Sequence, residues 1–179
     1  MFLLMGSVAH NSGISTALFK AARLWLGGLP GGLAVAANFA CAGFAAASGS
    51  STATAAAMGR ISVPEMTKAG YDPGLSTGTV ASAGTLGAMI PPSIAFVLYG
   101  IFAEVSISKL FIAGILPGVM TALIYATMIM VRCKINPSLG PAQAQDATRA
   151  EKFEALGEVW PLLALILVII GGLYGGIFT

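Results

Sequence analysis

Two apolar segments of this chain are interrupted at their centres, and these interruptions are its most informative pattern. The first segment, residues 31–61, is rich in alanine and carries the polar stretch Ser48–Thr52 at its middle. A membrane-spanning helix needs about 20 apolar residues, so the segment is too long for one span and too short for two. It predicts a re-entrant hairpin, in which two short helices enter the membrane and return to the side from which they came.

The second interrupted segment, residues 75–102, contains the break Gly84-Thr85-Leu86-Gly87, followed by Ile90-Pro91-Pro92-Ser93. Two adjacent prolines remove two amide donors and push the preceding residue out of the helical region. The pattern therefore predicts a discontinuous helix, whose unwound backbone exposes carbonyl oxygens near the middle of the bilayer.

The whole pattern divides the chain into six parts. In order, these are the end of a truncated span with an amphipathic interfacial helix at 1–30, the hairpin at 31–63, a polar connection and the discontinuous helix at 64–103, a transmembrane helix at 104–134, a polar linker outside the membrane at 135–159, and a further span at 160–179. The interfacial helix is expected at 15–26, because apolar and basic side chains fall on different sides there. Both ends of the chain look cut, which favours a fragment of a longer protein.

Composition settles the class of protein. Charged residues make up 9% of the chain and hydrophobic residues 56%, with a mean hydropathy of +0.87. Soluble domains carry about 25% charged residues, so the composition indicates an integral membrane protein. The net charge of +2 is small and dispersed, which argues against a nucleic-acid partner. Cys41 and Cys133 are expected to be free thiols, and His10 has no neighbours in sequence that would complete a metal site.

The basic residues indicate the side to which the hairpin opens. If the hairpin opens to the cytoplasm, the linker at 135–159 also faces the cytoplasm. The loop with Glu104 and Lys109 then lies on the opposite side of the membrane and carries no excess of basic residues. Cytoplasmic loops carry an excess of Lys and Arg, so this orientation is favoured. The basic residues that it places on the cytoplasmic side are Lys20, Arg23, Arg60, Lys68, Arg132 and Lys134.

Two discontinuous segments in one chain are the best sequence indication of a transporter's binding site. The hairpin tip offers hydroxyl and carbonyl oxygens without formal charge, and hard cations take oxygen ligands. The competing explanation is that the hydroxyls only bond to neighbouring helix turns and that the second break is a simple proline kink. The candidate ion- and substrate-binding residues are Ser48, Gly49, Ser50, Ser51, Thr52, Gly84, Thr85, Gly87, Ile90, Pro91, Pro92 and Ser93.

Five motifs follow one another along the chain: ASGSSTATAAAMG, PEMTKAGYDPGLSTG, ASAGTLGAMIPPS, LFIAGILPG and GGLYGGIFT. With them, the chain resembles the large membrane subunit (DctM-like) of TRAP transporters, the tripartite ATP-independent periplasmic transporters, over nearly its whole length. Large subunits of that family are far longer and contain two inverted repeats. The chain resembles the first repeat, the cytoplasmic linker and the opening helix of the second repeat.

The resemblance implies an all-α, polytopic membrane protein of the elevator type, in which a transport domain moves against a scaffold. It implies sodium-coupled symport of organic acids such as C4-dicarboxylates across the bacterial inner membrane, with sodium as coupling ion and no other cofactor. The implied partners are a small membrane subunit (DctQ-like), a periplasmic substrate-binding protein and membrane lipid. By the same resemblance, the first sodium site lies between hairpin tip and unwound helix, at Ser48, Ser51, Gly87, Ile90 and Pro92.

Three other interpretations stay open from the sequence. A sodium/carboxylate symporter that works without a binding protein shares the hairpin architecture. An inactive fragment of a permease gene has the same motifs. A membrane-embedded enzyme or a purely structural helix bundle is disfavoured, because an enzyme needs an intramembrane His, Asp or Glu and the apolar segments contain none.

Overall fold

Every regular element that the computed structural model describes is a helix. The structure describes residues 13–141, 148–160, 164, 166–168 and 171–172. Its elements are α2 (Ile14–Leu26), α3 (Gly32–Ser48), α4 (Ser51–Lys68), α5 (Pro73–Gly84), the 3-10 helix η1 (Thr85–Ala88), α6 (Ile94–Phe102), α7 (Ile107–Ile135), the 3-10 helix η2 (Pro137–Leu139) and α8 (Arg149–Glu158). The expected all-helical class is confirmed for this part of the chain. The expected span end at 1–9 and most of the span at 160–179 lie outside the described residues.

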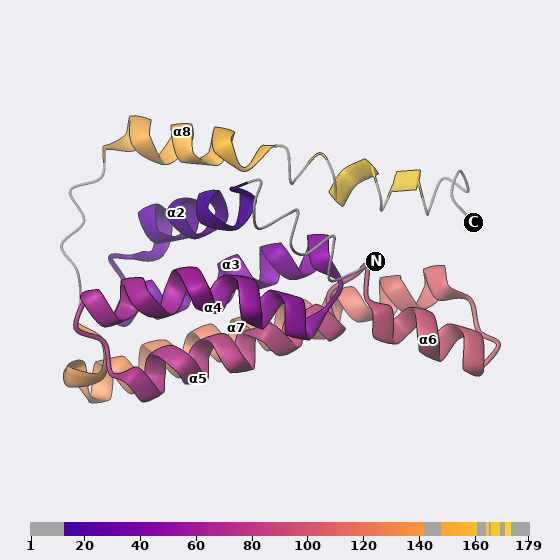
Figure 1. Cartoon of the computed structure of the whole chain (residues 1–179), viewed down its shortest axis with the longest axis horizontal. Coiled ribbons are helices and arrows are strands. Elements are labelled where there is room, and N and C mark those ends of the chain that lie inside the picture. The colour runs from indigo at the N-terminus through magenta and orange to yellow at the C-terminus, as the bar shows by residue number, and fades with distance from the viewer. Residues whose placement is uncertain (1–12, 142–147, 161–163, 165, 169–170, 173–179) are drawn as a thin grey trace.

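Helix α3 is the centre of the fold and packs against α2, α4, α5 and α7 (Figure 1). Alanine dominates its sequence, and its buried side chains lie on all sides of the helix. Small side chains let helix backbones approach closely without requiring large apolar residues between them. Phe44, which is fully buried, is the largest side chain that α3 adds to this core.

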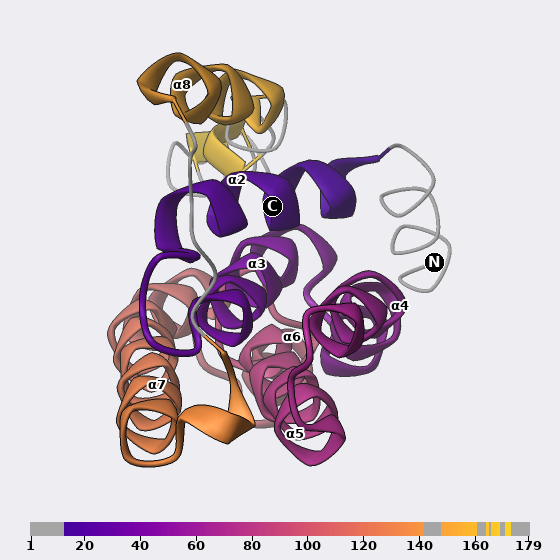
Figure 2. The same ribbon diagram turned by 90° about the vertical axis from the view of Figure 1, so that its left-hand side faces the viewer.

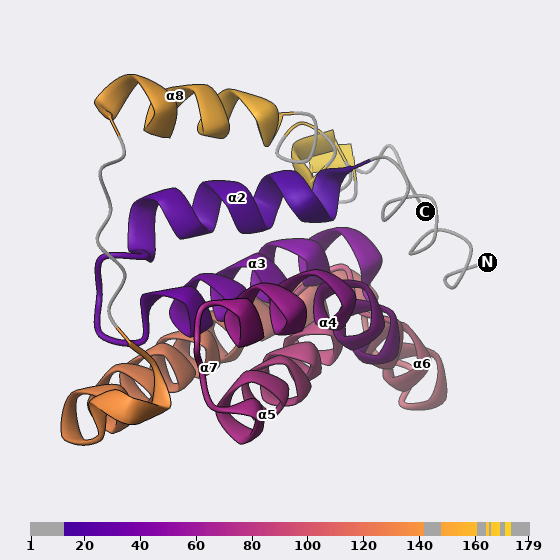
Figure 3. The ribbon, with the colours of Figure 1, turned by 60° about the vertical axis from the view of Figure 1, so that its left-hand side comes forward.

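Helices α2 and α8 form a separate layer on one side of the bundle. Seen along the bundle, α3, α4, α5 and α7 are viewed nearly end-on, whereas α2 runs across the view and α8 lies on its outer side (Figure 2). The two helices lie side by side in Figure 3, and Lys20 Nζ of α2 pairs with Glu158 Oε1 of α8 at 2.7 Å. The helix expected at 15–26 is confirmed, and the polar linker at 135–159 contains the helix α8.

Helix α4 corrects one expectation. The polar connection is expected to begin at residue 64, but the helix continues through Pro64 to Lys68 and ends before Gly70, which has a φ of 79°. Glu65 is therefore a helical residue rather than a loop residue. Its carboxylate pairs with Arg23 of α2 at 3.3 Å and with Lys68, one turn later, at 3.4 Å. Ion pairs at this spacing support a helix.

Helix α7 is the one described helix with the length and composition to cross a membrane. Its 29 residues extend over about 44 Å, and it corresponds to the transmembrane helix expected at 104–134. The helix ends at Ile135, within one residue of the expected end at 134. Large apolar side chains along it, such as Leu116, Val119 and Ile124, are exposed, as expected for a surface that faces lipid or further protein.

Candidate functional site

Helices α3 and α4 form a helical hairpin whose tip is Gly49–Ser50. Gly49 has a φ of 61°, and its amide closes α3 by donating to the Ala45 carbonyl at 2.8 Å. Ser50 is extended and begins α4, where its side-chain oxygen accepts the Ala53 amide at 3.4 Å. The left-handed conformation ends one helix and the serine cap starts the next within two residues. The reversal between the two helices is thus as tight as the sequence indicates.

The second predicted interruption is also present. Helix α5 tightens into η1, and the backbone then leaves the helical path between Met89 and Ser93 before α6 begins. The Ile90 amide still donates to the Leu86 carbonyl at 2.8 Å, but Pro91 and Pro92 have no amide to continue the ladder. Ser93 is extended and buried, and its hydroxyl donates back to the Ala88 carbonyl at 2.6 Å. The prediction of a discontinuous helix is confirmed.

The structure brings the tip and this break into direct contact (Figure 1). The Ile94 amide, the first of α6, donates to the Gly49 carbonyl at 3.2 Å. A Cβ on Gly49 would collide with the Pro92 carbonyl oxygen, and a Cβ on Gly87 would lie 2.7 Å from the Ser50 carbonyl. The absent side chains of the two glycines therefore allow two backbones to touch. Oxygens of both interrupted segments meet at this contact.

Hydroxyl groups at the tip form a small network. Ser48 Oγ lies 2.8 Å from Thr54 Oγ1, and the Thr54 hydroxyl donates to the Ser50 carbonyl at 2.8 Å. Ser48 and Thr54 are both fully buried. On the more open side of the tip, Ser50 Oγ lies 3.1 Å from Thr52 Oγ1. Sequence reasoning missed Thr54, although its position four residues after Ser50 places it one turn into the same helix.

Three further candidate residues, Gly84, Thr85 and Ser51, differ in their surroundings. Gly84 lies against α4, where an added Cβ would be 2.8 Å from the Ala55 side chain, so it allows α5 to pack beside the hairpin. Thr85 is exposed, and its hydroxyl is bonded to the Ser82 carbonyl at 2.6 Å. It therefore does not point into the contact between tip and break. Ser51 is half-buried at the first turn of α4.

A buried amide on α3 is a polar group that sequence reasoning did not single out. Asn38 is fully buried, and its Nδ2 donates to the Ala122 carbonyl of α7 at 2.9 Å, which ties the hairpin to the long helix. Its Oδ1 has no hydrogen-bond partner among the described residues. The available signal was a lone amide within an alanine-rich apolar segment, where burying a polar side chain costs free energy unless it is hydrogen-bonded.

The base of the hairpin is held by Tyr71, in the loop between α4 and α5. The buried Tyr71 hydroxyl accepts the amide of Leu33 at 3.2 Å, in the first turn of α3. Burial raises the pKa of Tyr71, because the phenolate would lose its hydration. Asp72 follows and caps α5, its carboxylate accepting the Leu75 amide at 2.8 Å. These bonds fix where both interrupted segments start.

No charged side chain occurs between residues 31 and 59 or between 73 and 103. The oxygens at the contact of tip and break are accordingly carbonyls and hydroxyls, each carrying only a partial charge. Such donors match a hard cation held without a carboxylate, and broken helices supply them in membrane transporters. The arrangement can bind a small ion or the polar part of a solute, and it offers no group for acid–base chemistry.

Comparison with known proteins identifies the family. The model of the DctM component of tripartite ATP-independent periplasmic transporters matches residues 1–179. The C4-dicarboxylate TRAP transporter large permease protein of Pseudomonas aeruginosa is 42% identical, covering 99% of this chain and 41% of the relative. The isethionate TRAP transporter permease protein DctMQ of Oleidesulfovibrio alaskensis is 39% identical, covering 99% of this chain and 28% of the relative.

An ectoine TRAP transporter large permease of Halomonas elongata is 36% identical, covering 100% of this chain and 41% of the relative. The chain thus spans about two fifths, or less, of the length of these relatives. All of them are membrane permease subunits of transporters and not enzymes, as the sequence led us to expect. The chain belongs to the DctM family, the large membrane permease subunits of tripartite ATP-independent periplasmic transporters.

Proposed function

We propose that this chain supplies the first ion site of a sodium-coupled, binding-protein-dependent permease for organic acids. The observation that carries the proposal is the contact between hairpin tip and helix break, where the Gly49 carbonyl accepts the Ile94 amide. In this proposal α3 and α4 form a re-entrant hairpin open to the cytoplasm, and sodium binds at Ser48, Ser51, Gly87, Ile90 and Pro92. The whole permease moves as an elevator in the bacterial inner membrane.

The buried network at the tip supports a division of roles in this site. The Ser48 hydroxyl is hydrogen-bonded to Thr54. Ser48 therefore contributes to sodium binding chiefly through its backbone carbonyl or through that hydroxyl network. Ser51 is half-buried and begins α4, which leaves its hydroxyl as the side-chain ligand. The remaining oxygens come from the backbone of the break, where the missing proline amides prevent a continuous helix.

The substrate proposal is a C4-dicarboxylate or a related small carboxylate. Relatives named for C4-dicarboxylates are 42%, 38% and 34% identical over 99% of this chain. Other relatives are named for ectoine, isethionate and sialic acid, all of which carry a carboxylate or sulfonate. The proposed partners are a periplasmic substrate-binding protein and a small membrane subunit, and the name DctMQ denotes a permease protein in which a second component is joined.

Sodium-titrated uptake tests the proposal. Residues 1–179 replace the matching segment of the Pseudomonas aeruginosa permease, and this chimeric permease is reconstituted in liposomes with its small subunit and binding protein. Ser51→Ala removes one ligand to a charged ion, worth about 1.5–3 kcal/mol, and weakens the sodium dependence of uptake about ten- to hundred-fold. Thr67→Ala is the matched control, because its hydroxyl on the same helix bonds only to the Val63 carbonyl among the described residues.

Other outcomes separate the alternatives. Unchanged sodium dependence in both Ser51→Ala and Ser48→Ala excludes a side-chain role at the tip. Gly87→Ala then tests the backbone, since its methyl group presses on the Ser50 carbonyl. Uptake that persists without the binding protein favours a binding-protein-independent symporter. Uptake that does not respond to sodium at all overturns ion coupling at this site.

A further inference from the structure

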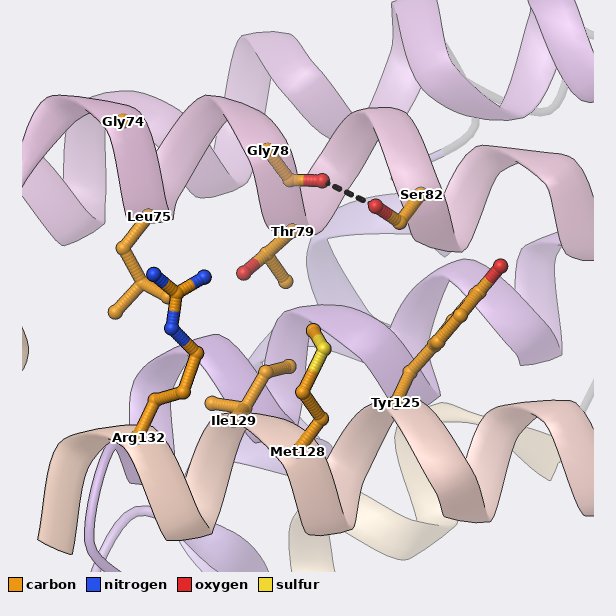
Figure 4. Close-up of a pocket in the computed structure, with 9 residues that line it drawn as sticks. All are labelled: Gly74, Leu75, Gly78, Thr79, Ser82, Tyr125, Met128, Ile129 and Arg132. Atoms are coloured by element: carbon orange, nitrogen blue, oxygen red, sulfur yellow. Dashed lines mark hydrogen bonds between the residues drawn. The ribbon is translucent and has the colours of Figure 1, made fainter. Parts of the chain in front are cut away.

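A cavity lies away from the hairpin tip, between α5 and α7 (Figure 4). It has a volume of about 120 Å³ and is partly open to the surface. Gly74 and Gly78 form the α5 side near the start of that helix, and Ile129 and Arg132 form part of the α7 side near its end. The cavity is therefore at the level where α7 leaves its apolar stretch, and none of the proposed sodium ligands lines it.

Two polar groups point toward the same part of this cavity. Figure 4 shows the Arg132 guanidinium reaching from α7 toward α5 and the Thr79 side chain facing it from α5. Thr79 is only 7% exposed, and its hydroxyl has no hydrogen-bond partner among the described residues. Arg132 belongs to none of the ion pairs that the described residues form. A cation and an unpaired hydroxyl at one cavity are complementary to an anionic group.

A shallow, open apolar groove on the exposed face of α7 adjoins this cavity. It has a volume of about 450 Å³ and is lined by Leu123, Ile124, Thr127, Met128, Val131 and Arg132. Met128 and Arg132 line both the groove and the cavity, so the two are continuous. From Ile124 to Arg132 the helix rises about 12 Å, and the large apolar side chains along it are exposed. The combined surface is cationic at one end and apolar along its length.

We propose that this surface binds one anionic phospholipid, with the phosphodiester at Arg132 and Thr79 and an acyl chain in the groove of α7. Basic pockets between transmembrane helices at the membrane surface suit acidic headgroups, and arginine pairs with phosphate more specifically than a diffuse charge does. Free phosphate shares the headgroup chemistry but not the acyl chain, so the groove favours the lipid. The inference rests on the membrane setting of the family and not on sodium coupling.

Native mass spectrometry of the 179-residue chain in detergent tests this site, with phosphatidylglycerol as the probe. The unaltered chain retains one phosphatidylglycerol, and Arg132→Gln lowers its association constant about ten-fold or more. Thr79→Val keeps the side-chain shape, removes the unpaired hydroxyl and lowers binding roughly two- to ten-fold. Lys134→Gln is the matched control, because this exposed cation lies two residues from Arg132 and lines neither cavity nor groove. Circular dichroism confirms that each variant remains helical.

Several results overturn the proposal. Equal losses in Arg132→Gln and Lys134→Gln indicate diffuse attraction to a basic helix end. Equal binding of phosphatidylcholine indicates non-specific surrounding lipid, and binding of glycerol phosphate as tight as that of phosphatidylglycerol indicates a soluble-anion site. Repeating the titration with the chimeric permease tests whether the groove is also free in the whole subunit. Loss of the lipid there shows that the rest of the permease occupies the groove.

Discussion

The carbonyl oxygen of Gly49 accepts a hydrogen bond from the amide of Ile94 at 3.2 Å, joining the tip of the hairpin to the point where the broken helix resumes. Gly49 has to be in the left-handed conformation and without a side chain for this bond to form, because the Pro92 carbonyl occupies the space of a Cβ. This bond and the close approach of Gly49 to Pro92 join the two interruptions. An ion at the contact is therefore expected to couple the two segments.

Gly49→Ala is expected to disrupt this contact. A left-handed alanine costs about 1–2 kcal/mol, and the collision with Pro92 adds to that cost, so uptake by the chimeric permease should lose its sodium dependence. Gly59→Ala is the control, because the nearest atom to an added Cβ is Val80 Cγ1 at 3.6 Å. It should retain uptake and gain about 0.5–1 kcal/mol of helix stability. Equal sodium dependence in both variants would show that the tip tolerates separation from the break.

Cysteine labelling tests the proposed membrane topology of the hairpin. In a cysteine-free chimeric permease, Gly28→Cys and Lys68→Cys mark exposed positions just before α3 and at the end of α4. Both should react with a membrane-impermeant thiol reagent from the cytoplasmic side. Ala103→Cys, exposed after α6, should react from the periplasmic side. Reaction of positions 28 and 68 from opposite sides would mean that α3 and α4 cross the membrane as one span.

Tyr71→Phe is expected to weaken the base of the hairpin. It leaves the buried Leu33 amide without its acceptor, at a cost of about 1–3 kcal/mol in the free energy of unfolding. Because burial raises the pKa of Tyr71, its neutral form stabilises the fold fully below its ordinary pKa of about 10. That contribution is lost as pH rises through the folded-state pKa.

Denaturation of the purified chain at pH 8 and pH 11 measures both effects. The unaltered chain should lose stability between these pH values more steeply than Tyr71→Phe does. Tyr99→Phe, at an exposed position of α6, should behave like the unaltered chain. A Tyr71→Phe variant as stable as Tyr99→Phe at pH 8 would indicate that the Leu33 amide finds another acceptor.

The layer formed by α2 and α8 can be tested by cross-linking. The rings of Trp25 and Phe153 meet edge to face with centroids 6.2 Å apart, and Trp25 Nε1 donates to the Lys152 carbonyl at 3.3 Å. Trp25→Cys with Phe153→Cys should therefore join through a short bifunctional thiol reagent within one chain. Trp25→Cys with Leu156→Cys provides a comparison at a second exposed position of α8. Cross-linking in neither pair would place α8 away from α2.

The sequence by itself determined the class of protein and the positions of its interruptions. Ser48–Thr52 and the Pro91-Pro92 pair act locally, because a polar reversal and missing amides break a helix whatever surrounds them. Local signals were less informative where a helix continued past a polar residue. Residues 64–68 resemble a connection in the sequence, but they continue α4 to Lys68, where Glu65 pairs with Arg23 of α2 and with Lys68.

Only the tertiary structure decided which of these local features meet. The contacts of Gly49 with Pro92 and of Gly87 with the Ser50 peptide depend on packing between segments that are distant in the sequence. The cavity of Thr79 and Arg132 has the same origin, since α5 and α7 place them together without any shared motif. The contact of Thr54 with Ser48 depends instead on how tightly the hairpin turns. Hydrophobic periodicity indicates which side of a segment is buried. Which other residues pack against that side is determined only by the tertiary structure.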